Sequence, residues 1–319
     1  MVDVSVIVAA WNADKTVVNA VRSACAQVGV TLEVVVADDA STDGTAAAVR
    51  EIGDPRVHYL RLPTNGGPAA ARNAAIDAAR GTWIAVLDAD DRLLPGRLAG
   101  LAASAARHGL DIVTDNMWIE DPAGRRRLFI DERLDAGVER LALAEYVMRN
   151  RLFGTRLGDG YLKPMFAAGL MRRHALCYDT TARIGEDFLL VAEAMTLGAT
   201  YGRVRSAGYV YTTGGISVSR RLRHQDAEAM ISADRRLIAR HAGSLAPAER
   251  VAWDAHLASL RDGASFIAMV DSIKARDFAS LAWHFGQRPA AIRHFAMPIR
   301  ARLDRAGCSL RAARDAAAA

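Results

Sequence analysis

The sequence predicts an α/β protein with a mainly parallel central sheet flanked by helices, followed by a helical C-terminal region. In the first 115 residues, short β-branched apolar runs alternate with segments of helical spacing, which is typical of a parallel sheet with helices on both faces. After residue 219, Ala, Leu and Arg dominate and no strand pattern stands out. The hydrophobic share of 51% and the charged share of 24% indicate a folded globular chain.

The elements of the first half follow from these two patterns. Strands are expected where the apolar runs are short, at residues 4–10, 32–37, 57–62, 83–87 and 111–114. Helices are expected between them, at residues 14–27, 45–52, 68–80 and 94–108. Pro68 suits a first helical turn, and Ser41-Thr42-Asp43-Gly44 supplies turn and cap chemistry.

The second half is less regular. Residues 121–131 indicate a hairpin or loop, residues 153–163 a Gly-rich mobile segment, and residues 209–213 a short strand. Helices are expected at residues 141–149 and 187–196. We place a domain boundary near Arg220, because the chain becomes wholly helical there.

Polar clusters follow three of the predicted strands. Trp11-Asn12 follows the first, Asp38-Asp39 the second, and Asp88 to Asp91 the fourth. Because ligands of such sheets bind outside the carboxyl ends of the strands, these clusters are expected to line one cleft. The last cluster holds three carboxylates within four residues, and acids so crowded need a compensating charge. A divalent metal shared with the phosphates of a nucleotide would supply it.

Three further positions have both a functional and a structural interpretation. Asp38 or Asp39 can accept hydrogen bonds from a base or ribose, or can cap the next turn. Arg72, in an Ala-rich helix, can reach the cleft and meet a diphosphate, or can be a solvated surface residue. Glu186-Asp187 can supply a general base, or can simply favour the start of a helix.

Several other classes of site are not indicated. No G-x-x-x-x-G-K-[ST] occurs, and no G-x-G-x-x-G follows the first strand, so neither a P-loop nor a dinucleotide fold is expected. The three cysteines lie far apart, as expected of reduced thiols in a cytoplasmic protein. No apolar run of about 18 residues and no basic stretch ahead of the first apolar one occurs, so neither a spanning helix nor a secretory signal is expected.

The same residues, taken in order, resemble the family 2 glycosyltransferases, an inverting group with the GT-A fold. The similarity covers about residues 3–219. Five segments carry it: residues 5–12 against the opening strand, 35–45 against V-D-D-x-S-x-D-x-T, 65–73 against N-x-G-x-x-x-A-R-N, 87–91 against D-x-D, and 185–187 against the E-D motif. The family commonly has Pro at the position of Ala9 and Tyr at that of Trp11, and backbone contacts and stacking can survive both changes.

For the donor, this resemblance implies contacts from four side chains. Asp39 would contact the uracil ring and Asp88 the ribose side. Arg72 would lie against the base or phosphates, and Trp11 would stack on the base. Residues 1 to about 115 would then form the nucleotide-binding half of a GT-A catalytic domain that ends at residue 219, with the acceptor half from about residue 116.

For the chemistry, the resemblance implies a metal site and a base. Asp90 would bind the Mn²⁺ or Mg²⁺ ion that bridges the donor diphosphate. Asp187 would deprotonate the acceptor hydroxyl, with Glu186 beside it as a substrate-binding residue. No Q-x-x-R-W follows these two acids, which argues against a processive synthase.

A narrower resemblance concerns residues 160–164, 183–187 and 208–219, which are similar to bacterial exopolysaccharide glucosyltransferases of the succinoglycan type. It implies transfer of glucose from UDP-glucose to a lipid-linked oligosaccharide. Ser217, Ser219 and Arg220 would lie near the diphosphate or form an ordinary loop.

The end of the chain is basic. The formal net charge is +5, and seven Arg against two Asp from Arg288 onward account for all of it. Together with apolar residues such as Phe285 and Ile292, this tail could sit on anionic lipid at the inner face of the cell membrane, or could pack on the catalytic domain.

Two other functional classes compete with a sugar transferase. A nucleotidyltransferase that makes nucleotide sugars also uses carboxylate-bound metal, but residues 9–14 lack its Gly-rich basic signature. A non-catalytic nucleotide-sugar-binding component of a polysaccharide assembly complex could retain Asp39 and Asp90 without needing Asp187. No nucleic-acid partner is expected, and the sequence leaves the donor sugar, the linkage and the oligomeric state open.

Overall fold

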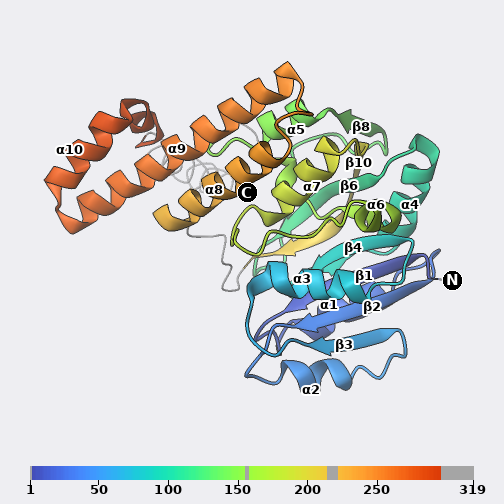
Figure 1. Cartoon of the computed structure of the whole chain (residues 1–319). Coiled ribbons are helices and arrows are strands. Elements are labelled where there is room, and N and C mark those ends of the chain that lie inside the picture. Colours follow the sequence, from blue (N-terminus) through green and yellow to red (C-terminus); the bar gives the residue numbers. More distant parts are fainter. Residues whose placement is uncertain (1, 155–157, 214–221, 296–319) are drawn as a thin grey trace, which may run out of the picture.

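The computed structural model describes residues 2–154, 158–213 and 222–295 of the chain. The predicted α/β fold is confirmed, because a ten-stranded sheet is flanked by helices on both faces (Figure 1). The strands are β1 (Val4–Ala10), β2 (Leu32–Asp38), β3 (Val57–Arg61), β4 (Trp83–Asp88), β5 (Arg92–Leu93), β6 (Ile112–Glu120), β7 (Arg126–Leu128), β8 (Val138–Leu141), β9 (Met165–Ala167) and β10 (Tyr201–Thr212). The helices are α1 (Val17–Cys25), α2 (Thr45–Arg50), α3 (Gly67–Ala78), α4 (Arg97–His108), α5 (Leu143–Arg149), α6 (Ala168–Arg173), α7 (Glu186–Thr196), α8 (His224–Arg240), α9 (Pro247–Ala275) and α10 (Phe278–Gln287).

The sheet is parallel where the sequence pattern is most regular. β3, β2, β1 and β4 are neighbours in this order and all run parallel. The register sets Ala9 beside Asp88 and Ala10 beside Asp38, so β1, β2 and β4 end level with one another. Beyond β4 the sheet is mixed: β6 and β10 run parallel, whereas β9 is antiparallel to β4 and β6 and joins the two halves.

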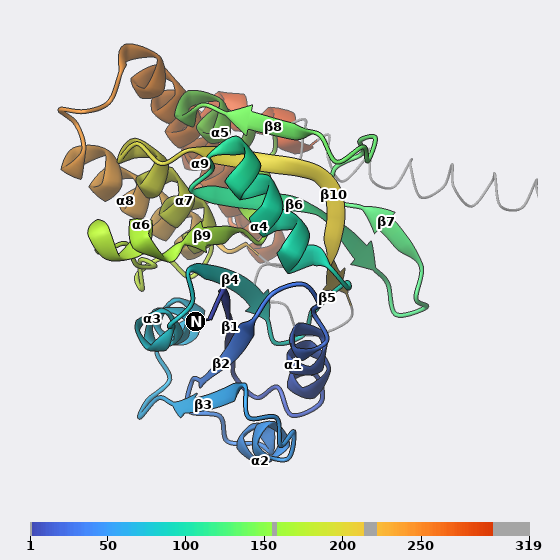
Figure 2. The ribbon, with the colours of Figure 1, turned by 90° about the vertical axis from the view of Figure 1, so that its right-hand side faces the viewer.

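Side chains of the parallel strands point alternately into two cores, as the period of a strand requires. Ile7 and Val35 belong to the core that includes α3, whereas Val6, Val8 and Val34 belong to the core that includes α1. Figure 2 shows α3 on one side of β1 and β2 and α1 on the other. Strands covered on both faces have no polar face, which is why they are continuous apolar runs in the sequence.

The C-terminal helices share a core with the sheet. α9 packs against α5 and α8, and the ring of Trp253 lies 5.7 Å from that of Phe188 in α7, between centroids. Trp253 and Leu237 belong to the same buried cluster as Ile7. The expected boundary near Arg220 lies outside the described residues, but this core runs across it.

α10 and a final 3₁₀ helix, η3 (Pro289–Phe295), pack on the distal part of α9, away from the sheet (Figure 1). The described part of the basic tail packs on α9, and contact of the tail with lipid stays a prediction. Arg288 and Arg293 lie 3.4 and 2.8 Å from the carboxylate of Asp262 in α9. The rest of the tail, from residue 296, lies outside the described residues. Within the described part of the chain, no helix is both long and apolar enough to span a bilayer.

The structure differs from the sequence expectation mainly in its second half. β6 extends to Glu120, β10 begins at Tyr201, and β8 and β9 were not expected. The first part of β10 does not have the apolar pattern of a buried strand, because it contains Arg203. This residue is buried and pairs with acids from three other segments. Residues 158–163 are not a mobile loop as a whole, because Leu162 and Lys163 are buried.

Candidate active site

The three polar clusters that follow predicted strands meet at one edge of the sheet, as expected. Trp11 follows β1 with its side chain exposed, and the turn after β4 carries Asp90 at the surface. Asn12 joins the ends of β1 and β2: its backbone N–H donates to Ser41 Oγ over 2.9 Å, and its side-chain carbonyl accepts from the backbone of Thr42. Hydrogen bonds therefore connect the loops that follow β1 and β2 at this edge.

The two acids after β2 are both engaged by the protein. Asp38 Oδ1 accepts from the backbone N–H of Ser41 over 2.9 Å, and its Oδ2 pairs with Arg61, so the turn-capping interpretation holds for Asp38. The Asp39 oxygens accept from the N–H groups of Gly66 and Gly67, each over 2.7 Å. Asp39 thus fixes the start of α3 beside the cleft, and its contact with a uracil ring stays a prediction.

Arg72 is buried rather than solvated. Its Nη2 lies 2.7 Å from Asp88 Oδ1 and its Nη1 lies 2.9 Å from Glu186 Oε1, so it joins the end of β4 to the start of α7. The guanidinium also lies over the ring of Tyr178, 5.2 Å from its centroid. An Arg that bridges two carboxylates and stacks on an aromatic ring holds a fixed orientation.

Lys163 is a second buried cation in the same cluster, and the sequence did not single it out. Its Nζ lies 2.7 Å from Asp187 Oδ2 and 3.0 Å from Asp88 Oδ2. Burial lowers the pKa of Lys163, but the charges of Asp187 and Asp88 outweigh burial and raise it overall, so the ammonium stays charged. The backbone carbonyl of Lys163 accepts from Arg97, which pairs with the buried Asp115.

The two carboxylate oxygens of Asp187 have different partners. Oδ2 accepts from Lys163, whereas Oδ1 is buried and lies 3.4 Å from Arg72 Nη1 in an ion pair without hydrogen-bond geometry, and the buried hydroxyl of Tyr178 interacts with the same carboxyl group. A buried acceptor oxygen without a donor is costly, so such an atom indicates a missing hydrogen-bond donor. A substrate hydroxyl at this position would supply that donor.

The carboxylates outnumber the cations. Asp88, Glu186 and Asp187 surround Arg72 and Lys163, and burial followed by the charge of Asp187 raises the pKa of Glu186. In the case of Asp88, burial is outweighed by the charges of Lys163 and Arg72, which lower its pKa. The cluster is therefore negative overall when its acids are ionised, and would attract a further cation.

Asp90 and Asp91 have different environments. Asp91 is buried and accepts from the Tyr209 hydroxyl and the Thr212 backbone over 2.7 and 2.8 Å, which ties the turn to β10. The Asp90 side chain is exposed at the surface, but nearby protein atoms displace part of its hydration. This desolvation, followed by the charge of Asp88, raises the pKa of Asp90. A small cavity of about 130 Å³ between α1 and this turn is lined by both acids.

The residues present fit a divalent ion only if the substrate provides most of its ligands. No group of three or more His, Cys, Asp and Glu side chains in the described ranges is arranged to hold a metal. Mg²⁺ commonly binds one or two carboxylates together with substrate phosphates, and Asp90 is an exposed carboxylate whose raised pKa a cation would offset. Asp90 therefore suits this mode of binding.

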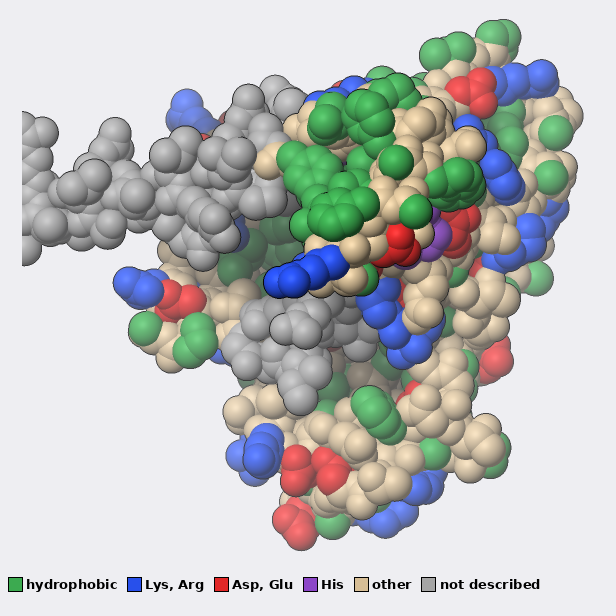
Figure 3. All heavy atoms as spheres, turned by 90° about the vertical axis from the view of Figure 1, so that its left-hand side faces the viewer, with side chains coloured by type: hydrophobic (Ala, Val, Ile, Leu, Met, Phe, Trp, Pro, Cys, Tyr) green, Lys and Arg blue, Asp and Glu red, His purple; other side chains and the backbone are tan. Residues whose placement is uncertain are grey.

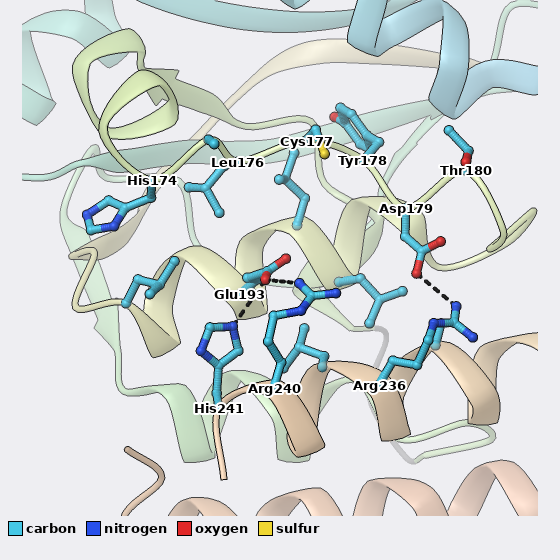
Figure 4. Close-up of a pocket in the computed structure, with 16 residues that line it drawn as sticks. His174, Leu176, Cys177, Tyr178, Asp179, Thr180, Glu193, Arg236, Arg240 and His241 are labelled. Carbon is cyan, nitrogen blue, oxygen red and sulfur yellow. Dashed lines mark hydrogen bonds and ion pairs between the residues drawn. The ribbon is translucent and has the colours of Figure 1, made fainter. Parts of the chain in front are cut away.

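A larger cavity of about 550 Å³ lies apart from these acids, between α7, α8 and residues 174–180 (Figure 4). Its charged side chains pair with one another: Asp179 with Arg236 over 2.9 Å, and Glu193 with both Arg240 and His241. None of the predicted site residues lines it. This cavity and the predicted site at the carboxyl edge of the sheet are therefore separate places.

The structure brings together five charged residues, namely Arg72, Asp88, Lys163, Glu186 and Asp187. Asp39, Asp90 and Trp11 lie at the same edge but outside this network of ion pairs, whereas Ser217, Ser219 and Arg220 lie outside the described residues. Lys163 gave only a weak signal in the sequence, as a single Lys before Pro164 in a Gly-containing segment.

Known proteins resemble the chain in sequence and fold. The sequence profile of glycosyl transferase family 2 matches residues 5–163. The succinoglycan biosynthesis protein ExoO of Rhizobium meliloti (strain 1021) is 40% identical over 303 residues, which is 95% of this chain and 86% of ExoO. The chain belongs to glycosyltransferase family 2. The expected resemblance to the succinoglycan type is also confirmed, because ExoO is such a protein.

Two further matches bear on this glycosyltransferase. The Escherichia coli protein WfaP, a UDP-Glc:alpha-D-GlcNAc-diphosphoundecaprenol beta-1,3-glucosyltransferase, is 40% identical over 88 residues, or 28% of this chain and 35% of WfaP. The structure of S. aureus TarS in complex with UDP-GlcNAc is similar with a TM-score of 0.60 at 18% identity, over 88% of this chain and 89% of that one. The fold expected for the family is thereby confirmed.

Proposed function

We propose that this glycosyltransferase transfers a sugar from a UDP-sugar to a hydroxyl of a lipid-linked glycan, with inversion at the anomeric centre. The proposed sugar is glucose. The glycan would be a growing bacterial exopolysaccharide or another surface glycan. ExoO supports the exopolysaccharide, WfaP supports the UDP-glucose donor and the lipid diphosphate acceptor, and TarS supports a UDP-sugar. The reaction would take place at the cytoplasmic face of the cell membrane.

The observation that supports this proposal is the buried Oδ1 of Asp187, which, among the described residues, only a 3.4 Å ion pair with Arg72 and the neighbouring Tyr178 hydroxyl engage. In the reaction, the acceptor hydroxyl would donate its hydrogen to Oδ1 and its oxygen would attack the anomeric carbon. The bond from that carbon to the diphosphate oxygen would break with inversion, and the proton would stay on Asp187 until product release. Lys163 and Arg72 keep the carboxylate oriented throughout.

The donor would bind across the ends of β1, β2 and β4. Trp11 would stack on the base and Asp39 would contact it or hold the loop beside it, with Asp88, Arg72 and Glu186 on the side of the ribose and sugar. A Mn²⁺ or Mg²⁺ ion held by Asp90 and the diphosphate would neutralise charge on the leaving group. The described residues provide the carboxylate for this role in Asp90.

The decisive experiment compares Asp187→Asn with the wild type. The substrates are UDP-glucose, Mn²⁺ and a short-chain lipid diphosphate saccharide, and UDP release and product are measured. We expect Asp187→Asn to lower kcat about 10²- to 10⁴-fold while UDP binding by calorimetry is retained, because only the proton acceptor is lost. Unchanged turnover in Asp187→Asn would remove Asp187 from the chemistry.

Further arms of the same assay test the donor and the metal. EDTA should abolish transfer and added Mn²⁺ should restore it, whereas full activity in EDTA would contradict the role of Asp90. A panel of UDP-sugars identifies the donor. A wild type that binds UDP-sugars but transfers none of them to any acceptor would favour the non-catalytic nucleotide-sugar-binding alternative.

A further inference from the structure

α10 exposes an apolar surface. None of its residues is buried, and its exposed positions are Phe278, Ala279, Ala282, Trp283, Phe285, Gly286 and Gln287, of which only Gln287 has a polar side chain. The three aromatic side chains are 71%, 61% and 44% exposed for Phe278, Trp283 and Phe285. Positions three and four apart in a helix share a face, so Phe278, Ala282 and Phe285 lie along one side of α10, and Ala279, Trp283 and Gly286 lie along the adjoining side. We call these two sides together the α10 face.

The inner side of α10 is already used. Leu281, His284 and Arg288 are partly buried on the side that packs against α9 and η3, and Asp277 caps the helix by accepting from the Ser280 backbone over 3.0 Å. Contacts with α9 and η3 therefore hold the helix in place, and the α10 face remains exposed. Figure 3 shows hydrophobic side chains gathered on this side of the molecule, with basic and acidic side chains beside them.

The surroundings of the α10 face hold further apolar side chains and charged side chains of both signs. Ile273 and Ile292 extend it and are 46% and 54% exposed. Lys274, Arg276 and Arg293 are exposed at its margins; Lys274 lies 3.5 Å from the exposed Asp271, Arg293 pairs with Asp262, and Asp277 is exposed at the start of α10. The chain then continues from η3 into residues 296–319, whose sequence has five Arg against two Asp.

The position of α10 relates this surface to the active site. The arrowheads of β1, β2 and β4 in Figure 1 point toward the side of the molecule from which α10 projects. A flat partner that touched the α10 face would thus lie on the side where the strands end and the acceptor must arrive.

We propose that the α10 face docks on the surface of an anionic lipid bilayer, with Phe278, Trp283 and Phe285 inserted at the level of the headgroups. Aromatic residues favour that depth, and the exposed cations at the margin, Lys274 and Arg276, gain from anionic lipid. A second copy of the chain is the competing occupant, and the oligomeric state of the α10 variant tests it. The docking rests on the proposed function only in that it explains delivery of a lipid-linked acceptor.

The test uses the full chain and flotation with vesicles of phosphatidylcholine, with and without about one-third phosphatidylglycerol. Wild type should bind the anionic vesicles, and the variant Phe278→Ala/Trp283→Ala should bind them at least about tenfold more weakly, because two inserted aromatic side chains are lost. The control Val28→Ala/Val251→Ala removes two equally exposed apolar side chains elsewhere and should bind as wild type does.

Several outcomes would overturn the proposal. These are equal binding of the α10 variant and wild type, no binding by wild type, and equal binding to vesicles without anionic lipid. A wild-type dimer in light scattering that the α10 variant loses would instead assign the face to a second copy. Turnover of a soluble short-chain acceptor separates this proposal from the proposed function: the α10 variant should keep it, whereas Asp187→Asn should lose it and still bind vesicles.

Discussion

Lys163 and Arg72 are the two buried cations of the candidate active site, and each contacts carboxylates from more than one element. Lys163 bridges Asp88 and Asp187, which belong to β4 and α7. Without Lys163, two like charges would face each other in a buried place, which is destabilising unless one of them is protonated. Lys163 is thus a positioning residue: it binds Asp187 Oδ2, while Oδ1 of the same carboxylate is the proposed proton acceptor.

We expect Lys163→Met to lower kcat about 10- to 100-fold, within the range that placement of a base contributes, and Lys163→Arg to recover part of it. The acidic limb of the pH–rate profile should move to higher pH in Lys163→Met, because a carboxylate that loses a neighbouring cation is protonated more easily. The exposed Lys274→Met is the control. A lower rate with an unmoved acidic limb would reduce Lys163 to a structural role.

Glu139 offers a pH-dependent prediction for stability. Hydrogen bonding to Arg149, together with the charges of Arg149 and Arg203, lowers the pKa of Glu139 from 4.5 to about 2 despite burial. Because the folded-state pKa is the lower one, the contribution is fully present above about pH 4.5 and is lost as pH falls toward 2. Glu139→Gln should therefore cost about 1–2 kcal/mol at pH 7, allowing for solvent screening, and less at pH 3.

Denaturant unfolding at both pH values checks the Glu139 prediction. Glu145→Gln is the control, since Glu145 pairs with the same Arg149 but is half exposed. It should cost less than about 0.5 kcal/mol at either pH. A Glu139→Gln cost that is independent of pH would contradict the assignment.

At the scale of an element, the start of α7 positions the proposed base. Gly185, with φ of 86°, is the N-cap of α7 and turns the chain so that Glu186 and Asp187 face Arg72 and Lys163. An L side chain is strained there, and a Cβ would lie 3.2 Å from Met230 Cε. The carboxylates of the E-D motif therefore depend on a glycine that has no chemistry of its own.

Gly185→Ala should destabilise the protein by about 1–2 kcal/mol through backbone strain and should also lower kcat by moving Asp187. Gly198→Ala is a matched control at the other end of α7, because its φ of 94° is equally strained and a Cβ would meet open space. It should cost similar stability but leave kcat unchanged. Equal turnover in both variants would mean that α7 tolerates the change without displacing its acids.

At the scale of the whole molecule, the catalytic region and the C-terminal helices should unfold together. Trp253 of α9 is fully buried against Phe188 and lies in the core that also contains Ile7 of β1. We expect Trp253→Ala to cost about 3–5 kcal/mol in a single transition, and Trp283→Ala on the exposed α10 face to cost little. Calorimetry with two separate transitions in the wild type would contradict a shared core.

The sequence predicted the fold best where each element carries its own pattern. β1 to β4 and the helices between them are regular, because strands buried on both faces must be apolar and each is followed by helical spacing. β10 was predicted only in its last part, since Arg203 becomes buried through acids that come from Glu132, Glu139 and Asp159. A strand of this kind has no local signature.

What the sequence determined by itself was the location of the site. Polar residues directly after apolar strands must emerge at the carboxyl edge of a parallel sheet, whichever partners they find there. What only the tertiary structure decided was the pairing of the charges: Arg72 with Glu186, Asp39 with the start of α3, and Lys163 with Asp187. The physical reason is that the free energy of a buried charge depends on the groups within a few ångströms of it, and these come from segments far apart in the chain.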